Sequence, residues 1–272
     1  MNLLQRLAHS DSPKLRHPFR SAVGYALQRS GFSARFKIAR NGYELPFFQF
    51  SNLALTLWSA PEWNDPAEKF AARWLKPGGV VVDAGANIGT FTATAATCVG
   101  PHGRVHAFEP HPASFSALLQ TVQMNRFANV ECHHAALSDK TGTLRISNLG
   151  RKDDNNHIVE QTFGGIDTPA LTLADFIARE NFTRIDFLKI DVEGHELAVL
   201  KGLGKHAGKV ACMHIEVLPQ TLARFGSNVS DITGWLKEAG FALFRFAGDA
   251  DNLVAINKSA NVDKTCPDLE PL

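Results

Sequence analysis

VVVDAGANIGTF, residues Val80–Phe91, joins a run of three valines to a glycine turn, and the architecture expected for the chain follows from it. Its short, continuous run of valines predicts a strand that is buried on both faces, as the strands of a parallel sheet are. Asp83 stands at the carboxyl end of this strand. Gly85 and Gly89 let the backbone turn sharply and approach a ligand, and a helix that starts at Thr90 would point its free N–H groups at that ligand. The stretch therefore predicts a binding turn for a nucleotide-like cofactor.

The spacing of the two glycines narrows the kind of cofactor. Gly85 and Gly89, with Asn87 between them, form a G-x-x-x-G pattern. The fingerprint of dinucleotide-binding folds is instead G-x-G-x-x-G, in which the pyrophosphate lies on the helix end. The spacing therefore weighs against a dinucleotide.

The composition predicts a globular protein. A chain of 272 residues, 44% of them hydrophobic, can build one large domain or a domain with an N-terminal extension. The formal net charge of +1 argues against a dedicated nucleic-acid binder. The four cysteines form no C-x-x-C pair, which indicates neither a zinc site nor a disulfide framework. Because the sequence shows no secretory signal and no apolar run of about 18 residues, we expect a cytoplasmic protein without stable membrane insertion.

The N-terminal segment has an uneven charge. Up to Arg40 it carries eight basic residues and one acidic residue, Asp11. Two interpretations stay open, a solvated leader or a segment that contacts an anionic carrier, a membrane surface or a partner.

The order of the expected elements predicts the architecture. Strands and helices alternate from residue 80 onwards, which predicts a mostly parallel, doubly wound α/β sheet. We expect Phe241–Phe246 and Leu253–Asn257 to end it as an antiparallel pair. We expect the chain to have three regions: an N-terminal basic and aromatic extension (1–60), the α/β domain (61–258) and a polar tail that frays (259–272).

Three further segments carry specific expectations. Asp65–Leu75 is expected to be a helix capped by Asn64 or Asp65. The aromatic stretch Tyr43–Trp58 is expected to be a strand or a hairpin. The polar, glycine-containing stretch Asn148–Pro169 is long for a connection within a compact domain, which predicts a functional flap or a mobile loop.

Polar residues also follow the second and third expected strands. Glu109 lies 20 positions after Gly89, where a carboxylate in a doubly wound fold can accept hydrogen bonds from both ribose hydroxyls. Its alternative role is that of an ordinary acid at a strand end. Ser138 and Asp139 end the third strand, where Asp139 and a backbone N–H could meet an adenine edge. The same SDKTG string is also a good turn, so both interpretations stay open.

A second polar cluster ends the fourth expected strand. Asp191 and His195 could both reach one substrate hydroxyl, and the intrinsic pKa of a histidine suits proton transfer. Glu193 either supports that site or is an acid favoured by the dipole of the next helix. Glu216 ends the neighbouring strand on the same face as His214, where substrate, metal and structural roles stay open.

Divalent-metal binding is the weaker interpretation of this cluster. The side chains of Asp191, His195, His214 and Glu216 offer suitable oxygen and nitrogen donors, but no tight spacing motif joins them. No metal site is therefore predicted.

Four motifs, read in order, give the chain a family resemblance. They are DAGANIGTF (83–91), GRVHAFEPHP (103–112), AALSDKTG (135–142) and LKIDVEGHE (188–196). Together they resemble the FkbM-type methyltransferases over about residues 65–257. The resemblance implies a class I, Rossmann-like methyltransferase fold that uses S-adenosyl-L-methionine. It also implies O-methylation of a hydroxyl on a sugar or a natural product.

The resemblance assigns roles to residues at matching motif positions. The methionine part of S-adenosylmethionine would be surrounded by Asp83, Gly85, Asn87 and Gly89. Glu109 would hold the ribose and Asp139, beside Ser138, the adenine, whereas Asp191 would face the methyl-transfer centre.

For catalysis we expect a base that removes the hydroxyl proton as the new bond forms. His195, oriented by Asp191 or Glu193, is the first candidate, and Asp191 alone is the second. Glu216 completes the expected catalytic group, and the acceptor would be a small molecule or a glycan with a free hydroxyl. Two other functions stay open: an NAD-dependent oxidoreductase, which the fold and Glu109 also support, and a non-catalytic cofactor-binding module.

Overall fold

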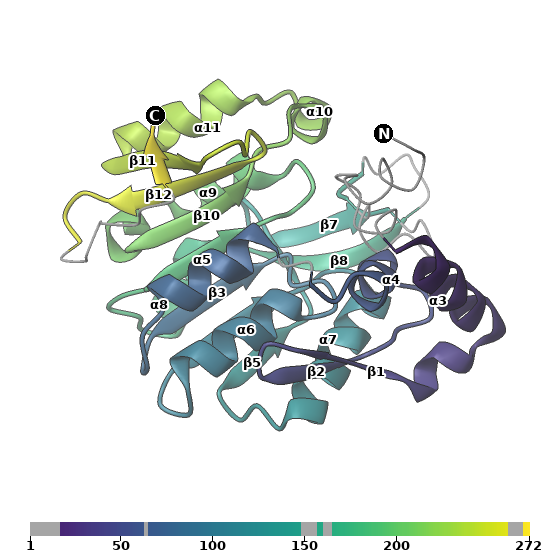
Figure 1. Cartoon of the computed structure of the whole chain (residues 1–272). Coiled ribbons are helices and arrows are strands. Elements are labelled where there is room, and N and C mark those ends of the chain that lie inside the picture. The colour runs from purple at the N-terminus through teal and green to yellow at the C-terminus, as the bar shows by residue number, and fades with distance from the viewer. Residues whose placement is uncertain (1–16, 63–64, 148–156, 160–164, 261–268) are drawn as a thin grey trace.

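The computed structural model describes residues 17–62, 65–147, 157–159, 165–260 and 269–272 of the chain. Its centre is an eight-stranded sheet with the strand order β13-β11-β12-β10-β9-β3-β4-β5 (Figure 1). In chain order these strands are β3 (Val80–Ala84), β4 (Arg104–Phe108), β5 (Val130–His133), β9 (Phe187–Ile190), β10 (Cys212–Glu216), β11 (Phe241–Phe246), β12 (Asn252–Asn257) and β13 (Leu269–Pro271).

The directions of the strands confirm the predicted architecture. The strands from β10 to β5 run parallel to their neighbours. β12, β11 and β13 continue the sheet beyond β10 as antiparallel neighbours. Because β3 lies inside the parallel part, Val81 and Val82 are fully buried, as the valine run predicted. The sheet is therefore doubly wound, mostly parallel, and antiparallel at its C-terminal end.

Helices cover both faces of the sheet. The helices of the α/β domain are α5 (Pro66–Trp74), α6 (Thr90–Val99), α7 (Pro112–Asn125), α8 (Leu173–Arg179), α9 (Glu196–Leu203), α10 (Pro219–Leu222) and α11 (Val229–Glu238). Two 3-10 turns, η3 (Gly204–Lys209) and η4 (Ala223–Phe225), follow α9 and α10. The apolar faces of α5 and α6 pack on one face of the sheet, and those of α8, α9 and α11 pack on the other. The expected helix at Asp65–Leu75 is confirmed as α5, because Asp65 accepts hydrogen bonds from the backbone N–H groups of Ala67 and Glu68.

The described part of the N-terminal region packs on this domain and shares a core with it. It comprises α3 (Pro18–Ser30), η1 (Phe32–Arg35), β1 (Lys37–Arg40), β2 (Tyr43–Pro46) and α4 (Asn52–Ser59). Leu45 and Leu57 from this region lie in one apolar cluster with Ile88 and Ala93 from the α/β domain. The structural core therefore continues across the expected boundary at residue 60.

The expected strand or hairpin at Tyr43–Trp58 is right only in its first part. β1 and β2 form an antiparallel hairpin, but Asn52–Ser59 is the helix α4. Ser51 caps this helix, since its side chain accepts a hydrogen bond from the backbone N–H of Ala54. Within the described residues, no helix is both long and apolar enough to cross a membrane.

A small sheet and the C-terminal strand correct two further expectations. The strands β6 (Ala136–Leu137), β7 (Gly142–Ile146) and β8 (Ile166–Leu171) form a three-stranded sheet in the order β6-β8-β7. β8 occupies the end of the expected loop Asn148–Pro169, and residues 148–156 and 160–164 lie outside the described part. The predicted fraying of the tail is wrong at Leu269–Pro271, because β13 pairs with β11.

Candidate active site

Asp83 joins the first strand to the elements around it. Its side chain is fully buried, and its Oδ2 accepts a hydrogen bond of 2.6 Å from the Thr92 hydroxyl at the start of α6. Its Oδ1 lies 3.8 Å from the Nζ of Lys189 on the neighbouring strand β9. A cavity lies at the carboxyl ends of β3, β4, β9 and β10, and Asp83 is not among the described residues that line it. Asp83 therefore supports the predicted cofactor turn from behind.

The two glycines of the turn pack against protein atoms. Both have positive φ, +84° at Gly85 and +88° at Gly89, which favours glycine. A Cβ on Gly85 would lie 1.8 Å from the carbonyl oxygen of Asp191, and a Cβ on Gly89 would lie 2.8 Å from the Leu118 side chain. Gly85 also lines the cavity, whereas Gly89 starts α6 behind it. The Gly85 turn and the Asp191 loop are thus in direct backbone contact.

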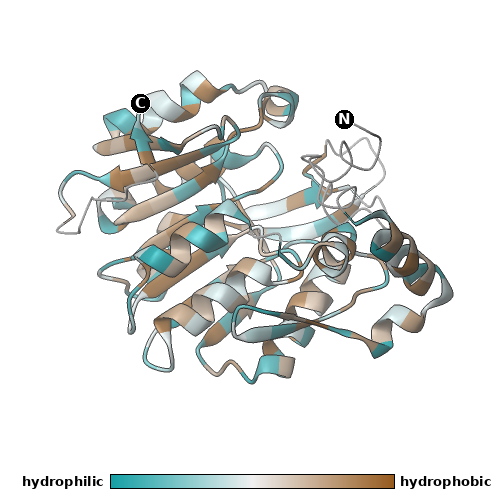
Figure 2. Cartoon of the chain, viewed as in Figure 1, coloured by the Kyte–Doolittle hydropathy of each residue, from teal (hydrophilic) through white to brown (hydrophobic). Residues whose placement is uncertain are grey.

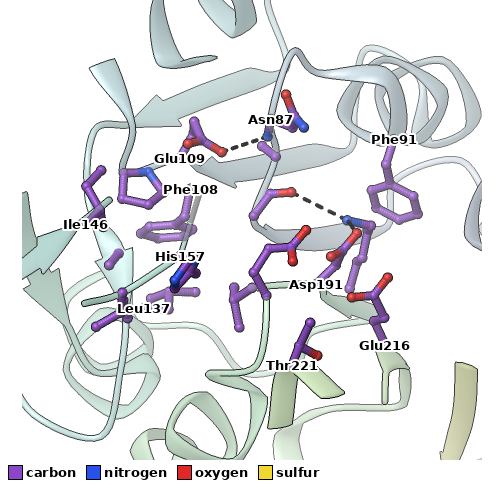
Figure 3. A pocket seen from close by; sticks show the side chains of 18 of the residues that line it. Asn87, Phe91, Phe108, Glu109, Leu137, Ile146, His157, Asp191, Glu216 and Thr221 are labelled. Atoms are coloured by element: carbon purple, nitrogen blue, oxygen red, sulfur yellow. Dashed lines mark hydrogen bonds and ion pairs between the residues drawn. The ribbon is translucent and has the colours of Figure 1, made fainter. Parts of the chain in front are cut away.

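Glu109 and Asn87 meet at the ends of β4 and β3 and line the cavity (Figure 3). The Glu109 carboxylate accepts hydrogen bonds of 2.8 Å from the backbone N–H groups of Asn87 and His111. A carboxylate can accept about four hydrogen bonds, so two acceptor positions are left for a ligand. Burial raises the pKa of Glu109 to about 7. Among the described residues, Asn87 Oδ1 is a buried acceptor without a hydrogen-bond partner.

Asp191, Glu193 and Glu216 come together on the other side of the cavity. Asp191 and Glu193 belong to the loop after β9, and Glu216 ends β10, so the carboxyl ends of neighbouring parallel strands supply them. One carboxylate oxygen from each of the three lies within 4.8 Å of the others. All three line the cavity, and Figure 3 shows the Asp191 and Glu216 side chains close together there.

The crowding of these acids changes the protonation of Glu216. Burial, followed by the nearby charges of Asp191 and Glu193, raises the pKa of Glu216 to about 10. Glu216 therefore keeps its proton at neutral pH and can donate a hydrogen bond. Among the described residues, its buried Oε2 has no hydrogen-bond partner.

Lys189 supplies the positive charge beside the acids, a role that the sequence analysis did not assign. Its Nζ donates a hydrogen bond of 3.0 Å to Asp191 Oδ2 and one of 3.4 Å to the Gly85 carbonyl. The ion pairs with Asp191 and Asp83 outweigh burial and raise its pKa. The signal for this role is the period of a strand, because Lys189 stands two residues before Asp191 on the same face.

His195 is placed away from the cavity, together with Ser138 and Asp139. Its Nε2 lies 2.9 Å from the Ser138 hydroxyl, which donates to Asp139 Oδ1 at 3.2 Å. Its ring packs edge-on against Phe225, with centroids 5.3 Å apart. Burial lowers the pKa of His195 to about 4. None of His195, Ser138 and Asp139 is among the described residues that line the cavity.

The four residues considered as metal ligands are brought together only in part. Asp191 and Glu216 meet, with Glu193 as the third donor. His195 belongs to the Ser138 group described above, and His214 is buried beside Phe246 on β11. A second group of possible ligands, His106, Glu131 and His133, lies on β4 and β5 outside the cavity lining.

The cavity has the size and chemistry that S-adenosylmethionine needs. Its volume is about 590 Å³, within the range of small-molecule sites. Beside Glu109 it has an apolar wall of Phe108, Leu137 and Ile146, which suits a flat base. The free acceptor positions of Glu109 suit the ribose hydroxyls, and Asn87 Oδ1 offers an acceptor to a charged amino group. The residues present therefore fit the cofactor that the sequence motifs implied.

The lining also includes residues from two segments that were expected to cover the acceptor, the aromatic stretch Tyr43–Trp58 and the flap Asn148–Pro169, and residues after β10 that the sequence analysis did not assign to the site. Leu53 and Thr56 reach it from α4, and His157 and Ile158 reach it from the segment after β7. Gln220, Thr221 and Arg224 add polar groups from α10 and η4. No local sequence pattern marks these residues individually, because none of them stands at the end of a strand of the central sheet. They reach the cavity only through the tertiary packing of their elements.

Known proteins resemble this chain in its central part. A relative from Streptomyces tacrolimicus, "31-O-demethyl-FK506 methyltransferase FkbM", is 33% identical over 47% of this chain and 61% of its own length. "Hexuronic acid methyltransferase AglP" of Haloferax volcanii is 27% identical over 59% of this chain and 62% of its own length. The chain thus spans about three fifths of these two relatives.

A solved structure and a family model complete the comparison. The structure of an FkbM methyltransferase from Methylobacillus flagellatus is 16% identical, covers 89% of this chain and 59% of its own, and has a TM-score of 0.47. The family model described as "Methyltransferase FkbM domain" matches residues 83–243, which is more than half of the chain and contains all four sequence motifs. The chain belongs to the FkbM methyltransferase family.

Proposed function

We propose that this protein transfers a methyl group from S-adenosylmethionine to a hydroxyl of a sugar or a hydroxylated natural product. The observation that carries the proposal is the Asp191, Glu193 and Glu216 group, which lines the same cavity as Gly85, Asn87 and Glu109. The names of two relatives support the acceptor class, since one relative is named for 31-O-demethyl-FK506 and the other for hexuronic acid. When bound, the cofactor supplies an already activated methyl group.

Binding of the cofactor falls to the residues at the ends of β3 and β4. Glu109, held by the N–H groups of Asn87 and His111, accepts from the ribose hydroxyls when it is ionised. Phe108, Leu137 and Ile146 enclose the base. Gly85 keeps this turn against the backbone of Asp191, so the two halves of the site hold a fixed relative position. Roles for Ser138 and Asp139 at the adenine remain predictions.

Deprotonation of the acceptor is assigned to Asp191. Lys189 holds the Asp191 carboxylate in place with an ion pair of 3.0 Å. Protonated Glu216 can donate to the acceptor oxygen and orient one of its lone pairs, while Asp191 accepts the hydroxyl proton. His195 was the first candidate for this role, but its ring nitrogen is bound to Ser138 outside the cavity lining. Asp191, the second candidate, is therefore preferred.

The polar residues on the far wall suit an acceptor with several hydroxyl groups. Gln220, Thr221 and Arg224 line the cavity there and offer both donors and acceptors. The carboxyl groups of Asp191, Glu193 and Glu216 disfavour an acceptor that carries an anion at its reacting position. An acidic group elsewhere on the acceptor could instead pair with Arg224.

The test is a cofactor-binding measurement followed by a methylation screen. Calorimetry should show binding of S-adenosylmethionine and of its demethylated product, and no binding of NAD. Mass spectrometry of a panel of hydroxylated sugars and natural products should then show a gain of one CH₂ in some member. Binding of NAD alone would support the oxidoreductase alternative. Binding of S-adenosylmethionine without methylation of any member would favour the non-catalytic module.

A further inference from the structure

The N-terminal helix region carries a concentration of exposed apolar side chains. In the described residues, seven large hydrophobic side chains are exposed, and five of them lie between residues 19 and 36. Phe19 is 83% exposed and Tyr25 is 54% exposed. We call this region the aromatic–basic surface; its apolar members are Phe19, Val23, Tyr25, Phe32 and Phe36, and its basic members are Arg20, Arg29 and Arg35. Scattered exposed apolar residues are ordinary, but such a concentration marks an interaction site.

The apolar residues of α3 share one side of the helix. Phe19, Val23 and Ala26 stand at i, i+4 and i+7, so they form one stripe, and Ala22 and Tyr25 flank it. The opposite side, with Gly24 and Gln28, is buried against the body of the protein. Figure 2 shows the hydrophobic colouring along α3. The exposed stripe is therefore not the side that packs on the core.

The charge of the same region has one sign. Residues 17–42 contain arginine and lysine but no aspartate or glutamate. Lys37 is paired with Glu44 and Arg40 with Glu68. Arg29 and Arg35 instead lie over the exposed rings of Tyr25 and Phe32, at 6.0 and 4.8 Å from the ring centres. An arginine beside an exposed aromatic ring suits the boundary between lipid headgroups and acyl chains.

These observations discriminate between possible occupants of the surface. A two-fold contact between copies of this chain would bring the arginines of both copies together, which is unfavourable. Nucleic acid would use the arginines but leave the exposed phenylalanines in water. A bilayer with anionic lipids satisfies both kinds of side chain, because the rings enter the interface and the guanidinium groups meet phosphates.

We propose that the aromatic–basic surface docks this protein on anionic membranes, without insertion of a spanning helix. The surface lies next to the cavity through α4. Gln28 Nε2 on α3 donates to the carbonyls of Phe48 and Ser51, at 2.7 and 2.8 Å, and Ser51 caps α4. α4 then presents Leu53 and Thr56 to the cavity. A docked protein would therefore hold α4 between the lipid-bound helix α3 and the acceptor cavity; Figure 1 shows α4 beside α3.

Vesicle flotation of the full chain tests the proposal without cofactor or acceptor, so its result is independent of the proposed function. The probes are vesicles of phosphatidylcholine alone and of phosphatidylcholine with phosphatidylglycerol. We expect binding only to the anionic vesicles, and less binding at high salt. The double variant Arg29→Gln/Arg35→Gln should weaken partitioning by about 25-fold, at roughly fivefold for each arginine near the surface. Phe19→Ser/Phe32→Ser should weaken it as well.

Matched controls separate the surface from general effects of charge and hydrophobicity. Lys140→Gln/Lys201→Gln removes two exposed charges elsewhere, and Leu119→Ser removes an exposed apolar side chain from α7. Both should leave partitioning unchanged. The proposal would be overturned if the wild-type chain did not float with anionic vesicles, or if the surface and control variants bound equally. It would also be overturned if sedimentation showed a dimer that the surface variants dissociate, since the surface would then join two copies.

Discussion

The loop between β9 and α9 has two parts with different surroundings. Asp191 and Glu193 face the cavity, where they meet Glu216. His195 and Glu196, a few residues later, are turned into the packing of the protein. His195 is bound to Ser138, and Glu196 accepts hydrogen bonds from the backbone N–H groups of Val192 and Gly194. Residues that are close in the sequence thus lie partly at the cavity and partly in the packing of the protein.

The backbone between the two parts explains the division. Glu193 and Gly194 both have positive φ, +56° and +106°, so the chain reverses its course before α9 begins. A Cβ on Gly194 would lie 2.3 Å from the Thr221 carbonyl, which fixes the turn against α10. The turn at Glu193 and Gly194, held against α10, therefore separates the part that faces the cavity from the part that packs into the protein.

The largest effect is expected for Gly85→Ala, which disturbs the support of Asp191. Its Cβ would clash with the Asp191 carbonyl in a left-handed backbone conformation. We expect the free energy of unfolding to fall by about 3 kcal/mol or more, with loss of cofactor binding. Denaturant unfolding and calorimetry measure both quantities. Gly78→Ala is the matched control, because Gly78 has the same φ of +84° and a Cβ there would meet no atom of the described residues within 4 Å, so only the backbone strain remains. Equal losses of stability and of cofactor binding in the two variants would show that the contact between Gly85 and the Asp191 carbonyl is unimportant.

Asp191→Asn should remove the proton acceptor and leave the binding of S-adenosylmethionine intact. We expect kcat to fall by about 100-fold or more, the usual loss for a general base. The Kd of S-adenosylmethionine should change by less than about threefold, an energy of under 1 kcal/mol. Steady-state kinetics and calorimetry test the two halves of this prediction. A variant that lost cofactor affinity instead of turnover would place Asp191 in the cofactor half.

Glu109 gives the cofactor half a pH dependence. Its pKa of about 7 means that the carboxylate is protonated below pH 7 and becomes a full acceptor for the ribose hydroxyls above it. Affinity for S-adenosylmethionine should therefore rise with pH through this range, by up to about tenfold per pH unit below the pKa. Glu109→Gln should bind about tenfold more weakly at pH 8 and lose this dependence. Calorimetry at several pH values would contradict the assignment if wild-type binding were independent of pH.

His195→Gln should affect stability more than turnover. Glutamine can still bond to Ser138 but fits less well against Phe225, so we expect a loss of about 1 kcal/mol in the free energy of unfolding. Since the pKa of His195 is about 4, its side chain is neutral at neutral pH, and its replacement should leave the pH–rate profile in place. Thermal or chemical unfolding and kinetics between pH 6 and 8 check this. If one limb of the pH–rate profile were lost in His195→Gln, His195 would take part in the proton transfer after all.

The smallest effect is expected for removal of divalent cations. Lys189 Nζ already lies 3.0 Å from Asp191, and Glu216 keeps its proton, so a second cation would be repelled and would lack one anionic ligand. A chelator should therefore leave kcat within the error of the assay. Loss of activity with EDTA, restored by Mg²⁺, would show that Asp191, Glu193 and Glu216 hold a metal ion instead.

The sequence pattern was sufficient for the sheet and for part of the site. The valine run, the G-x-x-x-G turn and Glu109 depend on neighbours a few residues away or on the ends of adjacent strands. The structure places them at the ends of adjacent strands, with Gly85, Asn87 and Glu109 at the cavity, and their roles toward the cofactor remain predictions. α4 was misjudged because the cap at Ser51 outweighs the strand-like residues that follow it. β8 and β13 were missed because each is stabilised by a distant strand, β7 and β11 respectively.

The position of His195 depends on tertiary contacts that no local pattern contains. In the sequence, a histidine four residues after Asp191 is a plausible partner that could reach the same substrate hydroxyl. In the structure, the turn at Glu193 intervenes, and Ser138, 57 residues away, binds the ring. Lys189 shows the opposite case, since the period of a strand already places it beside Asp191. Local periodicity thus determines neighbours within a strand, and packing determines what lies beyond the turn.

The most direct test compares Asp191→Asn and His195→Gln in single-turnover methylation of one accepted substrate, with S-adenosylmethionine saturating. We expect the methyl-transfer rate to fall by about 100-fold or more in Asp191→Asn and by less than about threefold in His195→Gln. The reverse order, a near-normal rate in Asp191→Asn and a large loss in His195→Gln, would contradict this expectation.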